Sequence, residues 1–318
     1  MSVSDVSALA KAIRSEVGKV IIGQKDTIDL MLTSLLSGGH ILLEGPPGTA
    51  KTFLARAFSN VLKFDFNRIQ FTPDLMPGDV LGANIFDFKS SDFKLTKGPV
   101  FTELLLADEI NRTPPKTQAA LLEAMQERSV TIDGQTYKLS PHFMVVATQN
   151  PIEQQGTYPL PEAQLDRFLF KHTLDYPDRD EELKIVSTQS MRNAQTGGND
   201  LGLTPVADQA AIAQVCETVS NLRISDEIIA YIVDIVRATR ETPAFSSGAS
   251  PRAAAMIAGA ARAYAALNER DYVLPDDVKV LAQPTLRHRV ILSPSAEIEG
   301  RDSDTALADL VAQIEAPR

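Results

Sequence analysis

The sequence predicts an α/β domain followed by a smaller helical domain, and three observations support this prediction. Short apolar runs at 41–43, 104–107 and 143–147 have the length of strands that are buried on both faces of a parallel sheet. A glycine-containing loop joins the first run to a helix-like segment, as in phosphate-binding strand–loop–helix units. Beyond residue 206 the apolar residues recur at helical spacing.

Length and composition agree with a folded, two-domain chain. The chain has 318 residues, of which 44% are hydrophobic and 23% charged, so we expect two packed units rather than disorder. The 31 basic residues are outnumbered by 41 acidic ones, and a formal net charge of -10 does not favour a broad surface for nucleic acid. A single cysteine, Cys216, excludes an intrachain disulfide and is consistent with a reducing compartment.

The N-terminus shows no secretory signal, and the apolar runs are far shorter than the roughly 18 residues of a spanning helix. We therefore expect a cytoplasmic protein without membrane insertion. A first helix is expected over 4–20 and a second over 25–36, the latter ended by Gly38 and Gly39.

The loop after the first strand differs at one position from the phosphate-binding pattern G-x-x-x-x-G-K-[ST], because Ala50 replaces the second glycine. Such a loop needs inward-facing amides, a lysine for the β and γ phosphates, and a hydroxyl for Mg²⁺. The alternative is a Gly-Pro turn that precedes Lys-Thr by chance. The predicted loop consists of Gly45, Pro46, Pro47, Gly48, Thr49, Ala50, Lys51 and Thr52.

Two further strand ends carry polar groups suited to phosphate chemistry. Asp108 and Glu109 end the run at 104–107, as expected for an Mg²⁺ ligand beside a residue that polarises water, although such pairs also cap helices. Asn150 ends the next buried strand, where an amide could orient the attacking water, although Asn-Pro is more often a turn. Between these strands we expect a helix over 114–128 and a hairpin over 129–139.

Together these residues resemble the AAA+ ATPases, and within them the MoxR family. The resemblance implies five parallel strands between helices and a C-terminal helical lid. It also implies an insert within helix 2 at 82–97 and identifies the hairpin at 129–139 as the one before sensor 1. The matching segments cover nearly the whole chain, and include 45–52, 70–79, 98–101, 106–112, 120–127, 147–151 and 160–168.

The resemblance also implies roles. Lys51 would hold the β and γ phosphates of ATP, Thr52 and Asp108 would hold Mg²⁺, Glu109 would position the water, and Asn150 would act as sensor 1. The predicted nucleotide-binding set is the loop 45–52 together with Gly23 and Gln24.

Arg167 resembles the arginine finger, which would act on ATP bound to the adjoining subunit and so requires a ring. The alternative is a surface arginine paired with Asp166 or Glu162. By the same resemblance Arg252 is sensor 2, at the start of a lid helix.

The predicted domains are an α/β core over 1–175, a linker over 176–205 and a lid over 206–318. Four lid helices are expected over 206–222, 225–241, 250–267 and 275–289, and no strands. The acidic cluster at 178–182 is expected to start a helix.

The resulting hypothesis is Mg²⁺-dependent ATP hydrolysis in a ring, with a hexamer expected, that remodels or activates partner proteins in a chaperone-like way. Family partners are typically von Willebrand factor A domain proteins. One alternative is a nucleic-acid motor, but the hairpin at 129–139 has only Lys138, offset by Asp133. Another is a nucleotide-binding scaffold with weak hydrolysis, whose signature would be loss of Glu109 or Arg167, and both are present.

Overall fold

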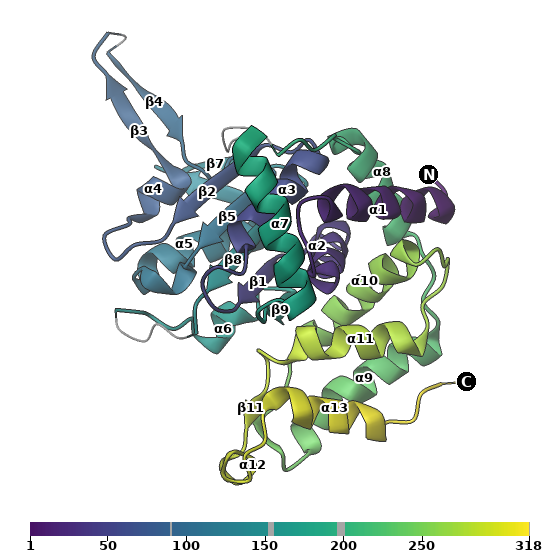
Figure 1. Cartoon of the computed structure of the whole chain (residues 1–318). Coiled ribbons are helices and arrows are strands. Elements are labelled where there is room, and N and C mark those ends of the chain that lie inside the picture. The colour runs from purple at the N-terminus through teal and green to yellow at the C-terminus, as the bar shows by residue number, and fades with distance from the viewer. Residues whose placement is uncertain (90, 152–155, 196–200, 318) are drawn as a thin grey trace.

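The structure is a computed structural model that describes residues 1–89, 91–151, 156–195 and 201–317. Its centre is a parallel sheet of five strands, as predicted, and their order is β2-β5-β8-β1-β9 (Figure 1). The strands are β1 Ile41–Glu44, β2 Phe66–Gln70, β5 Leu104–Asp108, β8 Met144–Gln149 and β9 Phe170–Thr173. Because all five strands run the same way, the polar residues that end β1, β5 and β8 meet at one edge.

Alternate residues of the strands feed two separate hydrophobic clusters, one on each face of the sheet. Leu42, Leu105 and Val145 belong to the cluster that includes α5 Pro115–Glu127. Leu43 and Leu106 point into the other cluster, which contains α1 Val3–Gly18, α2 Lys25–Leu36, α3 Lys51–Val61 and helices of the lid. This two-sided burial explains why the strands read as continuous apolar runs.

Two hairpins interrupt the alternation of strands and helices. The short helix α4 Pro77–Leu81 leads into β3 Gly82–Asp87 and β4 Asp92–Lys97, which pair antiparallel and project from the body (Figure 1). The second hairpin, β6 Ser129–Ile132 with β7 Gln135–Lys138, follows α5. Its turn residues Asp133 and Gly134 have φ values of 49° and 81°, as the Asp-Gly pair predicts.

The segment between the sheet and the lid contains more helix than expected. Helix α7 Arg179–Gln195 carries three acidic residues in its first turn, which confirms the helix start predicted at 178–182. Much of the predicted linker over 176–205 is therefore helical. The glycine-containing part of that prediction, 196–200, lies outside the described residues.

The C-terminal domain is helical, but the expectation that it has no strands was wrong. β10 Phe245–Ser247 pairs antiparallel with β11 Ile291–Leu292. These strands are too short for a period-2 pattern to be visible in the sequence. The helices are α8 Gln209–Ser220, α9 Asp226–Glu241, α10 Pro251–Leu267, α11 Pro275–Leu286, α12 Pro294–Ile298 and α13 Ser303–Gln313.

The lid packs directly on the N-terminal helices. Buried residues of α1, such as Ala10 and Ile13, share one hydrophobic cluster with Ile257 and Ala260 of α10. Helices α1 and α2 are both in contact with α10. In the part of the chain that the structure describes, every helix is too short or too polar to cross a membrane.

Candidate nucleotide-binding site

The loop between β1 and α3 is built as an anion-binding turn. Gly48 has a φ of 85°, and Ala50, which precedes the first residue of α3, is left-handed with a φ of 59°. No side chain caps this helix start, so its first-turn amides remain available to an anion. Gly45 is needed for close packing, because a Cβ there would lie 2.5 Å from the carbonyl oxygen of Leu174.

The side chain of Lys51 lies inside this loop. Its Nζ donates to the carbonyl oxygens of Gly45 at 2.9 Å and Pro46 at 2.8 Å, and to Thr49 Oγ1 at 3.0 Å. Burial lowers the pKa of Lys51, while the nearby negative charges of Asp108 and Glu109 oppose this shift. These contacts occupy all three ammonium hydrogens within the loop.

Asp108 presents its two carboxylate oxygens to different partners. Oδ1 accepts a hydrogen bond from Thr148 Oγ1 at 2.6 Å, which fixes the orientation of the carboxylate. Oδ2 accepts from Thr52 Oγ1 at 3.3 Å and from Arg68 Nη2 at 2.7 Å. The side chain is buried at the end of β5, and its hydrogen bond with Thr52 directs Oδ2 towards the start of α3.

Glu109 follows Asp108 in a left-handed conformation with a φ of 57°. Its Oε2 accepts hydrogen bonds from Gln70 Nε2 at 2.7 Å and Arg112 Nη1 at 3.0 Å. Its backbone amide donates to Thr148 Oγ1 at 2.9 Å. A single hydroxyl, that of Thr148, therefore holds both acidic residues.

One cavity of about 470 Å³ brings together most of the predicted site. It is lined by the loop 45–52 except Pro46, and by Asp108, Glu109 and Asn150. The three strand ends that the sequence singled out thus converge on one space. The full lining is Gly45, Pro47, Gly48, Thr49, Ala50, Lys51, Thr52, Phe53, Asp108, Glu109, Thr148, Gln149 and Asn150.

Other predicted residues lie apart from this cavity. Gly23 and Gln24 line a second cavity of about 240 Å³ with His172 and Tyr176, and Gln24 Nε2 reaches the loop by donating to the carbonyl oxygen of Thr49 at 2.8 Å. Arg252 does not line the first cavity and instead forms an ion pair with Asp166 at 3.7 Å.

Arg167 is half-buried and does not line the first cavity either. In the described parts of the chain its side chain makes no ion pair, so the pairing with Asp166 or Glu162 that the alternative required is not formed. The carboxylate of Asp166 binds two lid arginines instead.

Sequence reasoning missed Arg68, Gln70 and Thr148. Arg68 and Gln70 are two apart on β2 and so point to the same side, towards the acidic pair at the end of β5. Two polar residues at period 2 next to a buried strand were the available signal. Thr148 could have been found as a hydroxyl two positions before Asn150.

The donor set fits Mg²⁺ and a polyphosphate. Thr52 and Asp108 bring a hydroxyl and a carboxylate oxygen to 3.3 Å from each other, and Mg²⁺ prefers such oxygen ligands. The uncapped amides of α3 and the ammonium group of the half-buried Lys51 suit phosphate oxygens. These residues define a phosphate-handling site of the P-loop type.

Comparisons with known proteins agree with this geometry. Residues 40–170 match the family described as "ATPase family associated with various cellular activities (AAA)", and residues 237–310 match the AAA lid domain. The chain is 46% identical to the uncharacterized protein YeaC of Bacillus subtilis, over 97% of this chain and 95% of that protein. It is 42% identical to Chaperone MoxR1 of Mycobacterium tuberculosis, over 92% of this chain and 78% of that protein.

A crystal structure of an inferred ATPase from Cytophaga hutchinsonii is similar in fold as well. Its TM-score is 0.90 at 40% identity, covering 99% of this chain and 97% of that one. Fold and site thus define an AAA+ ATPase with a C-terminal lid. More narrowly, the chain belongs to the MoxR family of AAA+ ATPases.

Proposed function

We propose that this protein binds ATP with Mg²⁺ and hydrolyses it to drive changes in partner proteins. The observation that carries the proposal is the single cavity lined by Lys51, Thr52, Asp108, Glu109 and Asn150. These five side chains supply the cation, the metal ligands, the water-positioning carboxylate and the amide that phosphoanhydride hydrolysis requires.

Each residue has a distinct part in this proposal. Lys51 and the first-turn amides of α3 hold the phosphates, and Thr52 and Asp108 hold Mg²⁺, which when bound neutralises phosphate charge. Glu109 accepts a hydrogen bond from the attacking water, and its carboxylate is oriented for this by Gln70. Asn150 orients the same water from the end of β8.

The remaining predicted residues extend the site. Gly23 and Gln24 contact the nucleoside part of ATP in the second cavity, which the Gln24 contact to Thr49 links to the loop. Arg252 senses the nucleotide from the lid. Arg167 acts on the ATP of an adjoining subunit, so a ring, which we propose to be a hexamer, is part of the mechanism.

A protein is the substrate that we propose, rather than nucleic acid. The projecting hairpin exposes the apolar side chains of Ile85, Phe86, Phe88 and Phe93, with exposed fractions between 40% and 87%. Gripping phosphates requires several cations, whereas the second hairpin, at 129–139, carries only Lys138. A relative carries the name Chaperone MoxR1. We further propose a von Willebrand factor A domain partner and a cytoplasmic location.

The substitution Glu109→Gln tests the proposed hydrolysis. We expect turnover to fall at least about a hundredfold while ATP affinity is retained, because only the water-positioning charge is removed. Glu123→Gln on the exposed face of α5 is the matched control and should leave both unchanged. Steady-state phosphate release and nucleotide binding at equilibrium measure the two effects. Unchanged hydrolysis in Glu109→Gln would refute the role of Glu109.

The same variant tests the substrate class. Loaded with ATP, Glu109→Gln should retain its substrate, which can then be captured by affinity purification. We expect protein, and enrichment of nucleic acid instead would favour the motor alternative.

A further inference from the structure

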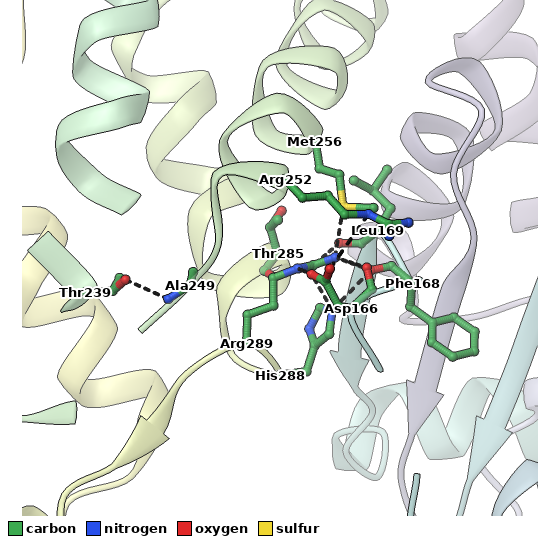
Figure 2. A network of polar contacts seen from close by, with 10 residues as sticks. All are labelled: Asp166, Phe168, Leu169, Thr239, Ala249, Arg252, Met256, Thr285, His288 and Arg289. Atoms are coloured by element: carbon green, nitrogen blue, oxygen red, sulfur yellow. Dashed lines mark hydrogen bonds and ion pairs between the residues drawn. The ribbon is translucent and has the colours of Figure 1, made fainter. Parts of the chain in front are cut away.

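The carboxylate of Asp166 lies between two arginines of the lid (Figure 2). Oδ1 accepts from Arg289 Nε at 2.6 Å, whereas Oδ2 lies 3.7 Å from Arg252 Nε. The two arginines differ in environment, because the side chain of Arg289 is 2% exposed and that of Arg252 is 42% exposed. The pair with Arg289 is therefore the fixed one, and the longer pair with Arg252 is the one that can open.

Arg289 also clamps the backbone of the segment 166–169. Its Nη2 donates to the carbonyl oxygens of Asp166 at 2.9 Å and Phe168 at 2.6 Å, and its Nη1 donates to that of Leu169 at 3.3 Å. It also donates to the carbonyl oxygen of Thr285 within its own domain (Figure 2). One buried guanidinium from the lid thus fixes three residues of a core-domain turn.

This turn carries Arg167. Among the described residues the side chain of Arg167 has no hydrogen-bonding or ionic partner, so within this part of the chain the backbone sets its position. That backbone is held on both sides, by Arg289 at Asp166 and Phe168, and by the amide of Arg167 itself donating to the carbonyl oxygen of Gln164 at 3.2 Å.

Arg252, the other partner of Asp166, follows a stretch of backbone that is hydrogen-bonded within the lid. Arg252 lies in the first turn of α10, and Ala249, just before this helix, donates its amide hydrogen to Thr239 Oγ1 at 2.9 Å (Figure 2). Thr239 is fully buried. The backbone just before the helix that carries Arg252 is therefore tied to the buried interior of the lid.

We propose that Arg289 is a positioning residue for hydrolysis in the neighbouring subunit: through Asp166 it sets the geometry of Arg167 and links it to the contact made by Arg252. When Arg252 leaves Asp166 Oδ2 for a nucleotide, Asp166 and its turn remain held by Arg289 alone. The turn 166–169, which carries Arg167, thereby responds to the nucleotide that Arg252 contacts. This inference rests on the proposed function of Arg167 and Arg252.

Steady-state kinetics provide the first test. Arg289→Met should lower kcat for ATP by at least about tenfold and change KM less than about threefold, because Arg289 is too buried to touch substrate. Arg289→Lys keeps the charge but loses the planar guanidinium that donates to several groups of the turn, so it should show the same kinetic pattern more weakly. This variant replaces Arg289→Met in the test if Arg289→Met does not fold. Asp166→Asn should resemble Arg289→Met.

A matched control separates positioning from stability. Arg270 pairs with the buried Asp277 inside the lid, with both contacts at 2.5 Å. Arg270→Met should lower the melting temperature about as much as Arg289→Met does while leaving kcat within about twofold of wild type. An equal loss of kcat in both variants would overturn the inference.

Subunit mixing provides the decisive test. In a ring that mixes the two variants, an Arg289→Met subunit supplies an intact Glu109 and a neighbouring Glu109→Gln subunit supplies an intact turn 166–169 with Arg167. Such interfaces should be active, so the mixture should hydrolyse ATP faster than either variant alone. Arg167→Ala mixed with Glu109→Gln is the reference and should recover likewise. Recovery with Arg167→Ala but not with Arg289→Met overturns the inference alone. Failure of both mixtures overturns the trans role of Arg167 and the inference with it.

Discussion

Arg68 and Asp108 form an ion pair at the carboxyl edge of the sheet, with Nη2 of Arg68 2.7 Å from Oδ2 of Asp108. The same carboxylate oxygen accepts the hydroxyl of Thr52. The guanidinium therefore binds the oxygen that we propose as a Mg²⁺ ligand, and the two cations compete for it.

Removing this competition should reduce the Mg²⁺ requirement. Arg68→Gln is expected to lower the half-saturating Mg²⁺ concentration about two- to fivefold, because a half-exposed ion pair contributes at most about 1 kcal/mol. A Mg²⁺ titration of hydrolysis at fixed ATP measures this, with Arg237→Gln, from an exposed pair on α9, as control. A higher Mg²⁺ requirement in Arg68→Gln would show that Arg68 supports the metal site rather than competing with it.

The hydroxyl of Thr148 should matter for both stability and turnover. Thr148→Val removes the donor to Asp108 Oδ1 and the acceptor of the Glu109 amide, so we expect a loss of about 1–3 kcal/mol in the free energy of unfolding and a lower kcat. Thr148→Ser keeps the hydroxyl and should retain most of the activity. Urea unfolding and steady-state kinetics on the two variants decide the point, and equal activity of both would contradict it.

The left-handed conformation of Ala50 predicts a stabilising substitution. An alanine at a φ of 59° is strained by about 1 kcal/mol, so Ala50→Gly should raise the free energy of unfolding by up to about that amount. Ala255→Gly, at an exposed position inside α10, should lower it by about 1 kcal/mol. Urea denaturation of both proteins measures the contrast, which would vanish if Ala50 were unstrained.

His40 should make the protein less stable in mild acid. Burial lowers the pKa of His40 from 6.5 to about 4, and its Nδ1 accepts a hydrogen bond from the amide of Val145. Below pH 6.5 the unfolded chain binds a proton that the folded chain does not. The contribution of the neutral His40 ring to the free energy of unfolding is thus fully present above pH 6.5. About 3 kcal/mol of that free energy is lost as the pH falls to 4. An NMR titration of the His40 ring should show no protonation at pH 5.5, and a midpoint near 6.5 would refute this.

The phosphate-binding core could be predicted because its signals are local. Asp108 ends a buried apolar strand, Asn150 follows directly on another, and the loop 45–50 joins a third to Lys51. Parallel strands necessarily bring their carboxyl ends to one edge. The hairpin turn at Asp133 and Gly134 could likewise be predicted, because the Asp-Gly pair itself favours the positive φ values that the turn needs.

The contacts across the domain boundary could not be predicted in this way. Arg289 is 123 residues from Asp166 in the chain, and neither residue shows in its own surroundings that the other will lie beside it. The strands β10 and β11 were missed because three and two residues carry no period. The pairing of Arg68 with Asp108 depends on β2 being the neighbour of β5, which is a property of the sheet order.

The packing of α1 against α10 also sets an order of events during synthesis. Lys11 of α1 forms an ion pair at 2.9 Å with Glu269, which lies 258 residues later, and the apolar side of α1 is buried against helices of that region. Helix α1 therefore cannot bury the side that faces the lid until the lid has been synthesised. The packing of α1 on α2 and α3 can form earlier, so the contacts of α1 with α10 are the long-range ones that complete this cluster late.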